Sequence, residues 1–243
     1  MKDDKITPSG EPKLSIREAG FAKWFDNFWY HYKIQAIIAL VLLFTVVIST
    51  VQLATRERFD YHLLYAGPRI IAVQDIAYMR RAVETVGEDI DKNGKVAVSI
   101  DDIVMLSPEE RAAAMEAGSV FNAEFINQSM NEYYQQIVAG EAVVCLLSPY
   151  MYDMVHESDG FMPLAEIFDE IPASAYDDCG ILLAKTEFGQ SFNGMDDLPE
   201  DTILCIRRLS SLSKMKGQNK TEKLHEGYVA LFKSIENYTA PVE

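Results

Sequence analysis

Three oxygen-bearing side chains at alternate positions, Asp89, Asp91 and Asn93, have the spacing that coordinates a calcium ion. Calcium-binding loops carry oxygen ligands at positions 1, 3 and 5 and a glycine at position 6, which Gly94 supplies here. The pattern fails at position 12, where Ile100 stands in place of the usual glutamate. The same residues suit a polar turn, because Asn and Gly accept positive φ angles. We therefore expect a turn between a helix and a strand, with calcium binding as the alternative.

A basic segment near the C-terminal end is the second candidate site. Residues 207–223 hold six Lys and Arg side chains and one acidic side chain. Cationic side chains clustered in this way bind phosphate groups, either of lipids or of free anions. The candidate anion or lipid contacts are Arg207, Arg208, Lys214 and Lys216. An ordinary solvated surface is the alternative interpretation.

The more specific sequence motifs for catalysis are absent from the chain. It contains no Walker A loop, and no Gly-x-Gly-x-x-Gly, Gly-x-Ser-x-Gly or His-Glu-x-x-His pattern. Cys145, Cys179 and Cys205 stand in apolar, strand-like contexts, where cysteine behaves as a small buried hydrophobe. A disulfide from Cys145 to either of the others needs adjacent strands, which the sequence leaves open. We expect no enzymatic activity and no cofactor, with calcium as the single alternative.

The net charge of the chain bears on which class of partner it can bind. The 243 residues carry a formal net charge of −15, and such a chain lacks the basic surplus that neutralises nucleic-acid phosphates. We therefore expect no nucleic-acid partner. Residues 153–201 hold thirteen acidic side chains and one Lys. This acidic stretch suits repulsion from an anionic membrane or attraction of cations or a basic partner, with a solvated surface as the alternative.

An apolar run anchors the chain. Residues 34–54 contain no charged side chain, and as a helix they span about 31 Å, the thickness of the hydrocarbon core. A buried core helix and a cleaved signal peptide are the alternatives, but thirty-three residues precede the run and no small-x-small cleavage site follows it. We predict an uncleaved transmembrane helix at 34–54 that contacts the lipid bilayer. The tail at 1–33 ends in an aromatic segment, predicted as either a juxtamembrane helix or an aromatic belt.

The orientation of this helix is not determined by charge. Three Lys or Arg side chains flank the run on each side, so the positive-inside rule gives no preference. A short N-terminal tail and a large C-terminal part are compatible with an N-terminus inside and a C-terminal domain outside the cell membrane. We expect this single-pass topology.

Strand and helix patterns alternate over residues 57–243. Buried or β-branched runs predict strands, and apolar residues at helical spacing predict helices. The expected strands are 60–66, 95–106, 142–147, 179–186 and 202–208. The expected helices are 73–86, 121–139, 149–155 and 219–238, with a further helix that begins at 107–110. This alternation predicts one acidic α/β sandwich domain with a mixed, largely parallel sheet of about five strands.

Several segments resemble known families. The segments 140–155, 160–167 and 176–183 are similar to a strand–helix corner, a Gly-x-x-Pro-Leu segment and the next strand of type-2 extracellular solute-binding proteins. The whole chain resembles uncharacterised single-pass membrane proteins of Gram-positive bacteria, through Trp29-Tyr-His-Tyr-Lys33 before the span and Asp60-Tyr61 after it. The resemblance implies an extracytoplasmic domain like one lobe of a solute-binding protein. A second lobe is not expected, because one strand and one long helix remain after residue 186.

These observations together predict a function. We expect a membrane-anchored, extracytoplasmic interaction domain that is non-catalytic and binds a protein partner or a component of the cell envelope. The alternative is a tethered receptor for a small-molecule solute, accessory to a transporter or a sensor. A receptor needs a pocket in which polar groups converge between mainly apolar walls.

Overall fold

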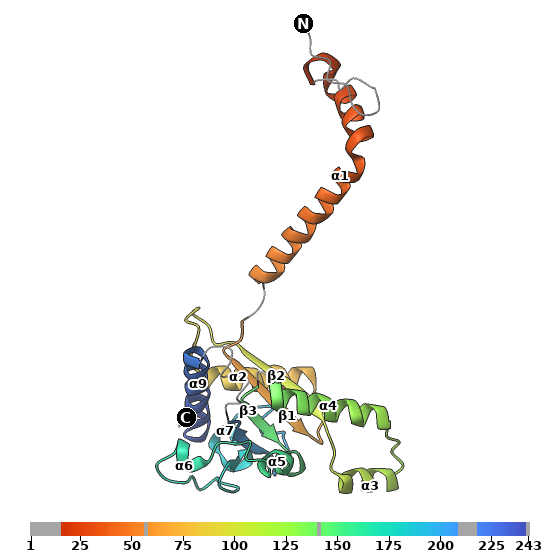
Figure 1. Ribbon diagram of the computed structural model, residues 1–243. Coiled ribbons are helices and arrows are strands. Elements are labelled where there is room, and N and C mark those ends of the chain that lie inside the picture. Colours follow the sequence, from red (N-terminus) through yellow and green to blue (C-terminus); the bar gives the residue numbers. More distant parts are fainter. Residues whose placement is uncertain (1–15, 56–57, 140–141, 209–217, 242–243) are drawn as a thin grey trace. The chain divides into compact units, whose positions relative to one another are not determined.

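The computed structural model describes residues 16–55, 58–139, 142–208 and 218–241. The chain divides into two compact units, Met1–Glu57 and Arg58–Glu243. The first unit contains helix α1, and the second contains a sheet with the remaining helices (Figure 1).

Helix α1 runs without a break over Ile16–Thr55. Its segment Phe28–Gln52 is long and apolar enough to cross a membrane, and none of it is buried inside the protein. The hydroxyl groups of Thr45 and Thr50 donate to the carbonyl oxygens four residues earlier, at 2.9 and 2.7 Å. These bonds satisfy the two hydroxyls within the helix, as a hydrocarbon environment requires. The aromatic segment before residue 34 is therefore helical and continuous with the expected span.

The sheet of the second unit has five strands in the order β2-β1-β3-β5-β4. Their bounds are Tyr61–Gly67 (β1), Val98–Val104 (β2), Val144–Leu147 (β3), Gly180–Leu182 (β4) and Ile203–Ile206 (β5). β1 pairs in parallel with β2 and β3, whereas β5 pairs antiparallel with β3 and β4. This confirms the expected α/β fold with a mixed sheet of five strands.

Helices cover both faces of the sheet, because the strands are apolar on both sides. In β1, Leu63 and Tyr65 belong to one buried cluster, and Leu64 and Ala66 belong to the other. The first cluster is covered by α2 (Val73–Val86), α6 (Leu164–Ile167), α7 (Glu187–Ser191) and α9 (Gln218–Glu236). The second cluster is covered by α4 (Ala123–Ala139) and α5 (Pro149–His156). The domain is thus an α/β/α sandwich, the usual solution for a sheet with two apolar faces.

Helix α3 (Pro108–Glu116) begins where the sequence indicates. Ser107 accepts a hydrogen bond from the backbone N–H of Glu110 at 3.1 Å, and the Glu110 carboxylate accepts from the N–H of Ser107 at 2.7 Å. This reciprocal pair is a capping box, which satisfies two of the free N–H groups at a helix start.

The expected strand at 179–186 is shorter in the structure. β4 ends at Leu182, and a single 3₁₀ turn follows at Leu183–Lys185. The cause is Thr186, whose hydroxyl accepts from the N–H of Gly189 at 2.9 Å and begins helix α7. An N-cap residue has the extended backbone angles of a strand residue. An apolar run that ends at an N-cap residue therefore predicts a longer strand than the chain forms.

Candidate functional site

The predicted calcium loop folds as a turn in which the carboxylates accept hydrogen bonds from backbone N–H groups of the same turn. Asp89 accepts hydrogen bonds from the N–H groups of Asn93 and Gly94, at 3.1 and 2.6 Å. Asp91 accepts from the N–H of Asn93 at 3.0 Å, and Asn93 accepts from the N–H of Lys95 at 3.0 Å. Desolvation alone would raise the pKa of Asp89, but the N–H groups donated to its carboxylate lower it. The expected polar turn therefore accounts for all three residues.

The sequence analysis missed a further carboxylate that belongs to this loop. Asp60, buried at the start of β1, accepts from the N–H groups of Ile90, Asp91 and Ala97 at 3.0, 3.1 and 2.9 Å. Oxygen atoms of Asp60, Asp89 and Asp91 lie within 4.8 Å of one another. Each of the three carboxylates already accepts hydrogen bonds from backbone N–H groups. These bonds account for the cluster of carboxylates without a bound ion. Calcium binding stays a prediction, and its test is given below.

Of the basic residues predicted to contact anions, the structure describes Arg207 and Arg208, and Arg207 is placed differently from expectation. Arg207 is buried, and its Nη1 donates to the carbonyl oxygens of Gln136 and Ala142, both at 2.6 Å. Burial lowers the pKa of Arg207. Its guanidinium therefore links α4 and the start of β3 to β5 rather than facing an anion in solvent. The reason is its position at the end of an apolar strand, where the side chain turns inward to unpaired carbonyls.

Arg208 is partly exposed and already faces acidic side chains. Its Nε lies 3.5 Å from Asp159 Oδ1, and its Nη1 lies 3.5 Å from Glu166 Oε1. Lys214 and Lys216, the other two predicted contacts, lie outside the described residues. The structure therefore does not bring the four predicted contacts together in the part of the chain that it describes.

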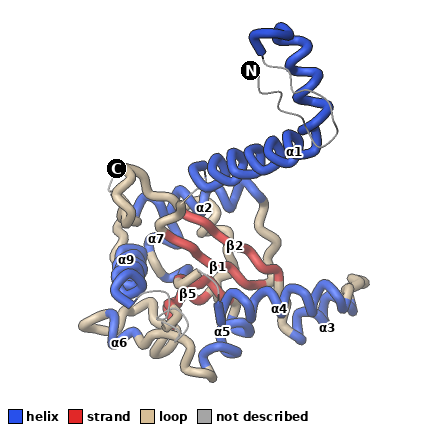
Figure 2. The backbone as a smooth tube through the Cα atoms, turned by 45° about the horizontal axis from the view of Figure 1, so that its top comes forward, coloured by secondary structure: helices blue, strands red, loops and turns tan. Residues whose placement is uncertain are grey.

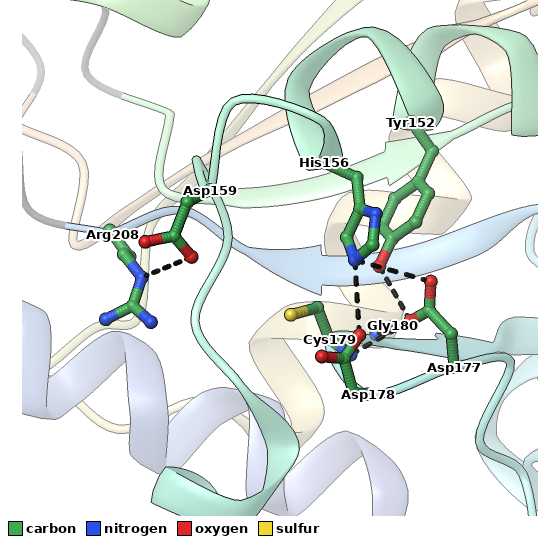
Figure 3. A network of polar contacts seen from close by, with 8 residues as sticks. All are labelled: Tyr152, His156, Asp159, Asp177, Asp178, Cys179, Gly180 and Arg208. Atoms are coloured by element: carbon green, nitrogen blue, oxygen red, sulfur yellow. Dashed lines mark hydrogen bonds and ion pairs between the residues drawn. The ribbon is translucent and has the colours of Figure 1, made fainter.

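A polar network that the sequence analysis did not identify joins α5 to the turn before β4 (Figure 3). Its centre is Asp177, whose Oδ1 accepts from the Tyr152 hydroxyl at 2.8 Å and from the N–H groups of Cys179 and Gly180, each at 2.9 Å. Gly180 is required here, because an added Cβ would lie 2.5 Å from Ile203 Cγ2. The Asp177 carboxylate thus fixes the backbone of the turn.

His156, at the end of α5, completes this network. Its ring stacks on Tyr152 with centroids 5.2 Å apart, and its Nε2 lies 3.2 Å from Asp178 Oδ1 and 3.7 Å from Asp177 Oδ2. The hydrogen bond with His156 lowers the pKa of Asp178. Burial and, next, the neighbouring carboxylates raise the pKa of the Cys179 thiol to about 12. An imidazole, a carboxylate and a thiol therefore meet beside a rigid turn.

All three cysteines are buried and free, in line with the behaviour expected of small hydrophobes. Cys145 and Cys205 are direct partners across β3 and β5, and the Cys205 thiol donates to the Cys145 carbonyl at 3.7 Å. Burial raises the pKa of Cys205 well above its usual range. The strand adjacency that the sequence left open thus exists for this pair.

One segment of the domain contributes nothing to its core. From residue 107 to residue 128, no residue is buried; this segment, α3 with the start of α4, is here called the α3–α4 arm. Figure 2 shows it at one side of the domain, beyond the sheet. Val120 is 96 % exposed, and Met115 and Phe125 are also exposed. The arm carries four glutamates and a single Arg. The arm therefore exposes large apolar side chains on a segment that is acidic overall.

A hollow of about 550 Å³ lies along α4 and overlaps the arm, to which Glu124, Asn127 and Gln128 also belong. Its walls are six polar side chains of this one helix: Glu124, Asn127, Gln128, Asn131, Glu132 and Gln135. Sites for small molecules are instead enclosed and mainly apolar, with a few convergent polar groups. The hollow is a shallow polar surface.

Comparison of the chain with known protein families, curated proteins and solved structures gives no match.

Proposed function

We propose that this protein is a membrane-anchored, extracytoplasmic, non-catalytic interaction domain that binds a protein partner through the α3–α4 arm. The observation that carries the proposal is the arm itself, 22 residues without a buried side chain on an otherwise well-packed domain. Apolar side chains that a fold leaves in water at one place are typical of interaction surfaces. Met115, Val120 and Phe125 are the proposed anchors.

The energetics suit a protein partner. Burying each of Met115, Val120 and Phe125 completely would contribute about 1.5–3 kcal/mol, before the cost of association is subtracted. The glutamates around these anchors add charge complementarity, which selects partners more than it adds affinity. We therefore infer an apolar groove bordered by Lys and Arg on the partner.

The anchor and the orientation are part of the same proposal. Segment Phe28–Gln52 supports a transmembrane anchor, because it is uncharged between Lys33 and its end and no part of it is buried. We propose that the C-terminal domain lies outside the cell, and the resemblance to single-pass proteins of Gram-positive bacteria supports this orientation. Protease added to intact cells should then remove a C-terminal epitope tag. Protection of the tag, with digestion only after lysis, would reverse the orientation.

Site-specific photocrosslinking in native membranes tests the arm. A photoreactive amino acid at Val120 of the full-length chain should give one discrete adduct with a membrane or envelope protein, and Phe125→Ala should weaken it. The matched control is the same probe at Ile171, an exposed apolar side chain outside the arm. Equal labelling from both positions, or no adduct from position 120, would refute the proposal.

A tethered solute receptor is the second candidate. Its support is the row of amide and carboxylate side chains along α4, which line a shallow hollow rather than an enclosed pocket. Amides and carboxylates suit a polar solute such as an amino acid or a sugar. Thermal unfolding of the full-length protein with a panel of such solutes separates the two functions. A ligand at a hundred times its Kd adds about 2.7 kcal/mol of stability. Stabilisation by one solute, lost in Asn131→Ala, would favour the receptor over the interaction domain.

A further inference from the structure

We propose that His156, Asp178 and Cys179 form a binding site for a divalent transition metal, with zinc as the best fit. The three residues come from the end of α5 and from the turn before β4 (Figure 3), and none of them belongs to the α3–α4 arm. The site is therefore independent of the interaction function proposed above.

The geometry is close to that of a zinc site. One nitrogen, one oxygen and one sulfur atom of these residues all lie within 4.8 Å of one another, and His156 Nε2 lies 3.2 Å from Asp178 Oδ1. Tetrahedral zinc, with bonds of about 2.0–2.3 Å, holds neighbouring ligand atoms about 3.3–3.6 Å apart. The imidazole nitrogen and the carboxylate oxygen, 3.2 Å apart, lie slightly closer than this, and the Cys179 sulfur lies within 4.8 Å of both. Small side-chain movements would complete the three-ligand set.

The ligand types select the metal. Thiolate and imidazole favour zinc and related transition metals, whereas calcium and magnesium prefer sites made only of oxygen. On binding, the Cys179 sulfur exchanges its proton for a bond to the metal, and the proton passes to solvent. The Asp178 side chain is 76 % exposed, so the fourth position faces water. A three-ligand site with an open position is typical of exchangeable or reactive zinc.

The surroundings hold the three ligands in place before any metal binds. Asp177 fixes the backbone N–H groups of Cys179 and Gly180, and it accepts from the Tyr152 hydroxyl. Tyr152 is buried and stacks on the His156 ring, which restricts the orientation of the imidazole. Supporting contacts of this kind reduce the entropy lost when a metal binds. An accidental surface pair of His and Asp would not require this second layer of buried contacts.

A bound metal would connect two parts of the chain. His156 ends α5, which packs on the second core cluster, and Asp178 and Cys179 precede β4, one of the two edge strands of the sheet. Joining them closes a loop of about twenty residues that contains α6. Metal binding would therefore stabilise the folded domain, because the unfolded chain does not hold the three ligands together.

Cobalt is a suitable probe, because tetrahedral Co²⁺ absorbs visible light and a Co–thiolate bond adds a charge-transfer band in the near ultraviolet. The experiment uses the full-length, tag-free protein in mild detergent, treated with a chelator and then dialysed. Titration should give one Co²⁺ per chain with both spectral signatures, and Zn²⁺ should displace it. Thermal unfolding should shift upward with Zn²⁺ and not with Mg²⁺.

Variants separate the site from adventitious binding. Cys179→Ser should remove the charge-transfer band, and His156→Gln and Asp178→Asn should each weaken Zn²⁺ binding by at least tenfold. Asp178→Asn alters an exposed side chain, so it preserves the test if another variant fails to fold. Cys145→Ala removes a buried thiol outside the site and should leave Co²⁺ binding unchanged. The proposal is overturned if micromolar Co²⁺ and Zn²⁺ do not bind, or if all three ligand variants bind them as tightly as the wild type.

Discussion

Replacing Asp60 by alanine should destabilise the domain more than any change within the loop that Asp60 holds. The Asp60 carboxylate accepts three backbone N–H groups of residues 90–97, at 2.9–3.1 Å. A hydrogen bond to a charged group contributes about 1.5–3 kcal/mol. The three donors are partly exposed, so water recovers part of each loss. We expect Asp60→Ala to lower the free energy of unfolding by about 3 kcal/mol.

Urea unfolding of the full-length protein in mild detergent measures this loss. Both tryptophans, Trp24 and Trp29, lie in α1, so their fluorescence does not report the α/β domain. Near-ultraviolet circular dichroism of the buried tyrosines does report it. For a slope of about 2 kcal/mol per molar urea, the loss lowers the midpoint by roughly 1.5 M.

The matched control is Asp89→Ala, which removes an exposed carboxylate from the same loop. It should lower the midpoint by less than half as much, because its donors face water. Equal shifts for the two variants would refute the role given to Asp60. Urea unfolding also tests calcium binding. If the loop is only a turn, millimolar Ca²⁺ should leave the urea midpoint of the wild-type protein unchanged. A rise that both variants abolish would instead identify a calcium site.

Other substitutions test the interior polar contacts by the same urea assay. Arg207→Met leaves two main-chain carbonyls without their donor and should cost roughly 3 kcal/mol, whereas Arg208→Met at the surface should cost less than about 1 kcal/mol. Tyr133→Phe removes a 2.6 Å bond to a carbonyl of α5 and should cost about 1 kcal/mol. Burial raises the pKa of Glu236 above its unfolded value, although the bond from Ser174 opposes the shift. The stability that this group contributes is therefore complete at low pH and is lost as pH rises through the folded pKa. Glu236→Gln should reduce the fall in midpoint between pH 4 and pH 7, and an unchanged fall would contradict this assignment.

Local patterns were sufficient to predict the elements of the fold. The run 142–147 is apolar at every position, which predicts a central strand covered on both faces, and β3 occupies that place. Ser107 and Pro108 predict the start of a helix, and the capping box confirms it. These signals depend on neighbours within a few residues, so a single sequence contains them.

The candidate metal site depends on contacts that a single sequence does not show. His156 and Asp178 are far apart along the chain and meet because β4 pairs with β5 and so places its preceding turn beside α5. Arg207 is buried for a similar reason, since the carbonyls that it satisfies lie more than sixty residues away. Charge patterns alone therefore placed Arg207 on the surface. The one usable signal was the pair of aspartates before an apolar run, which is typical of a side-chain-capped turn.

The strand order also determines when the domain can become complete during synthesis. β5 lies between β3 and β4, although it is the last of the five strands in the chain. After residue 147, the ribosome must add 59 residues before β5 ends, which takes about 3–12 s at 5–20 residues per second. Throughout this interval β3 has an unpaired apolar edge, the kind of surface that chaperones bind and that aggregates when it is left free.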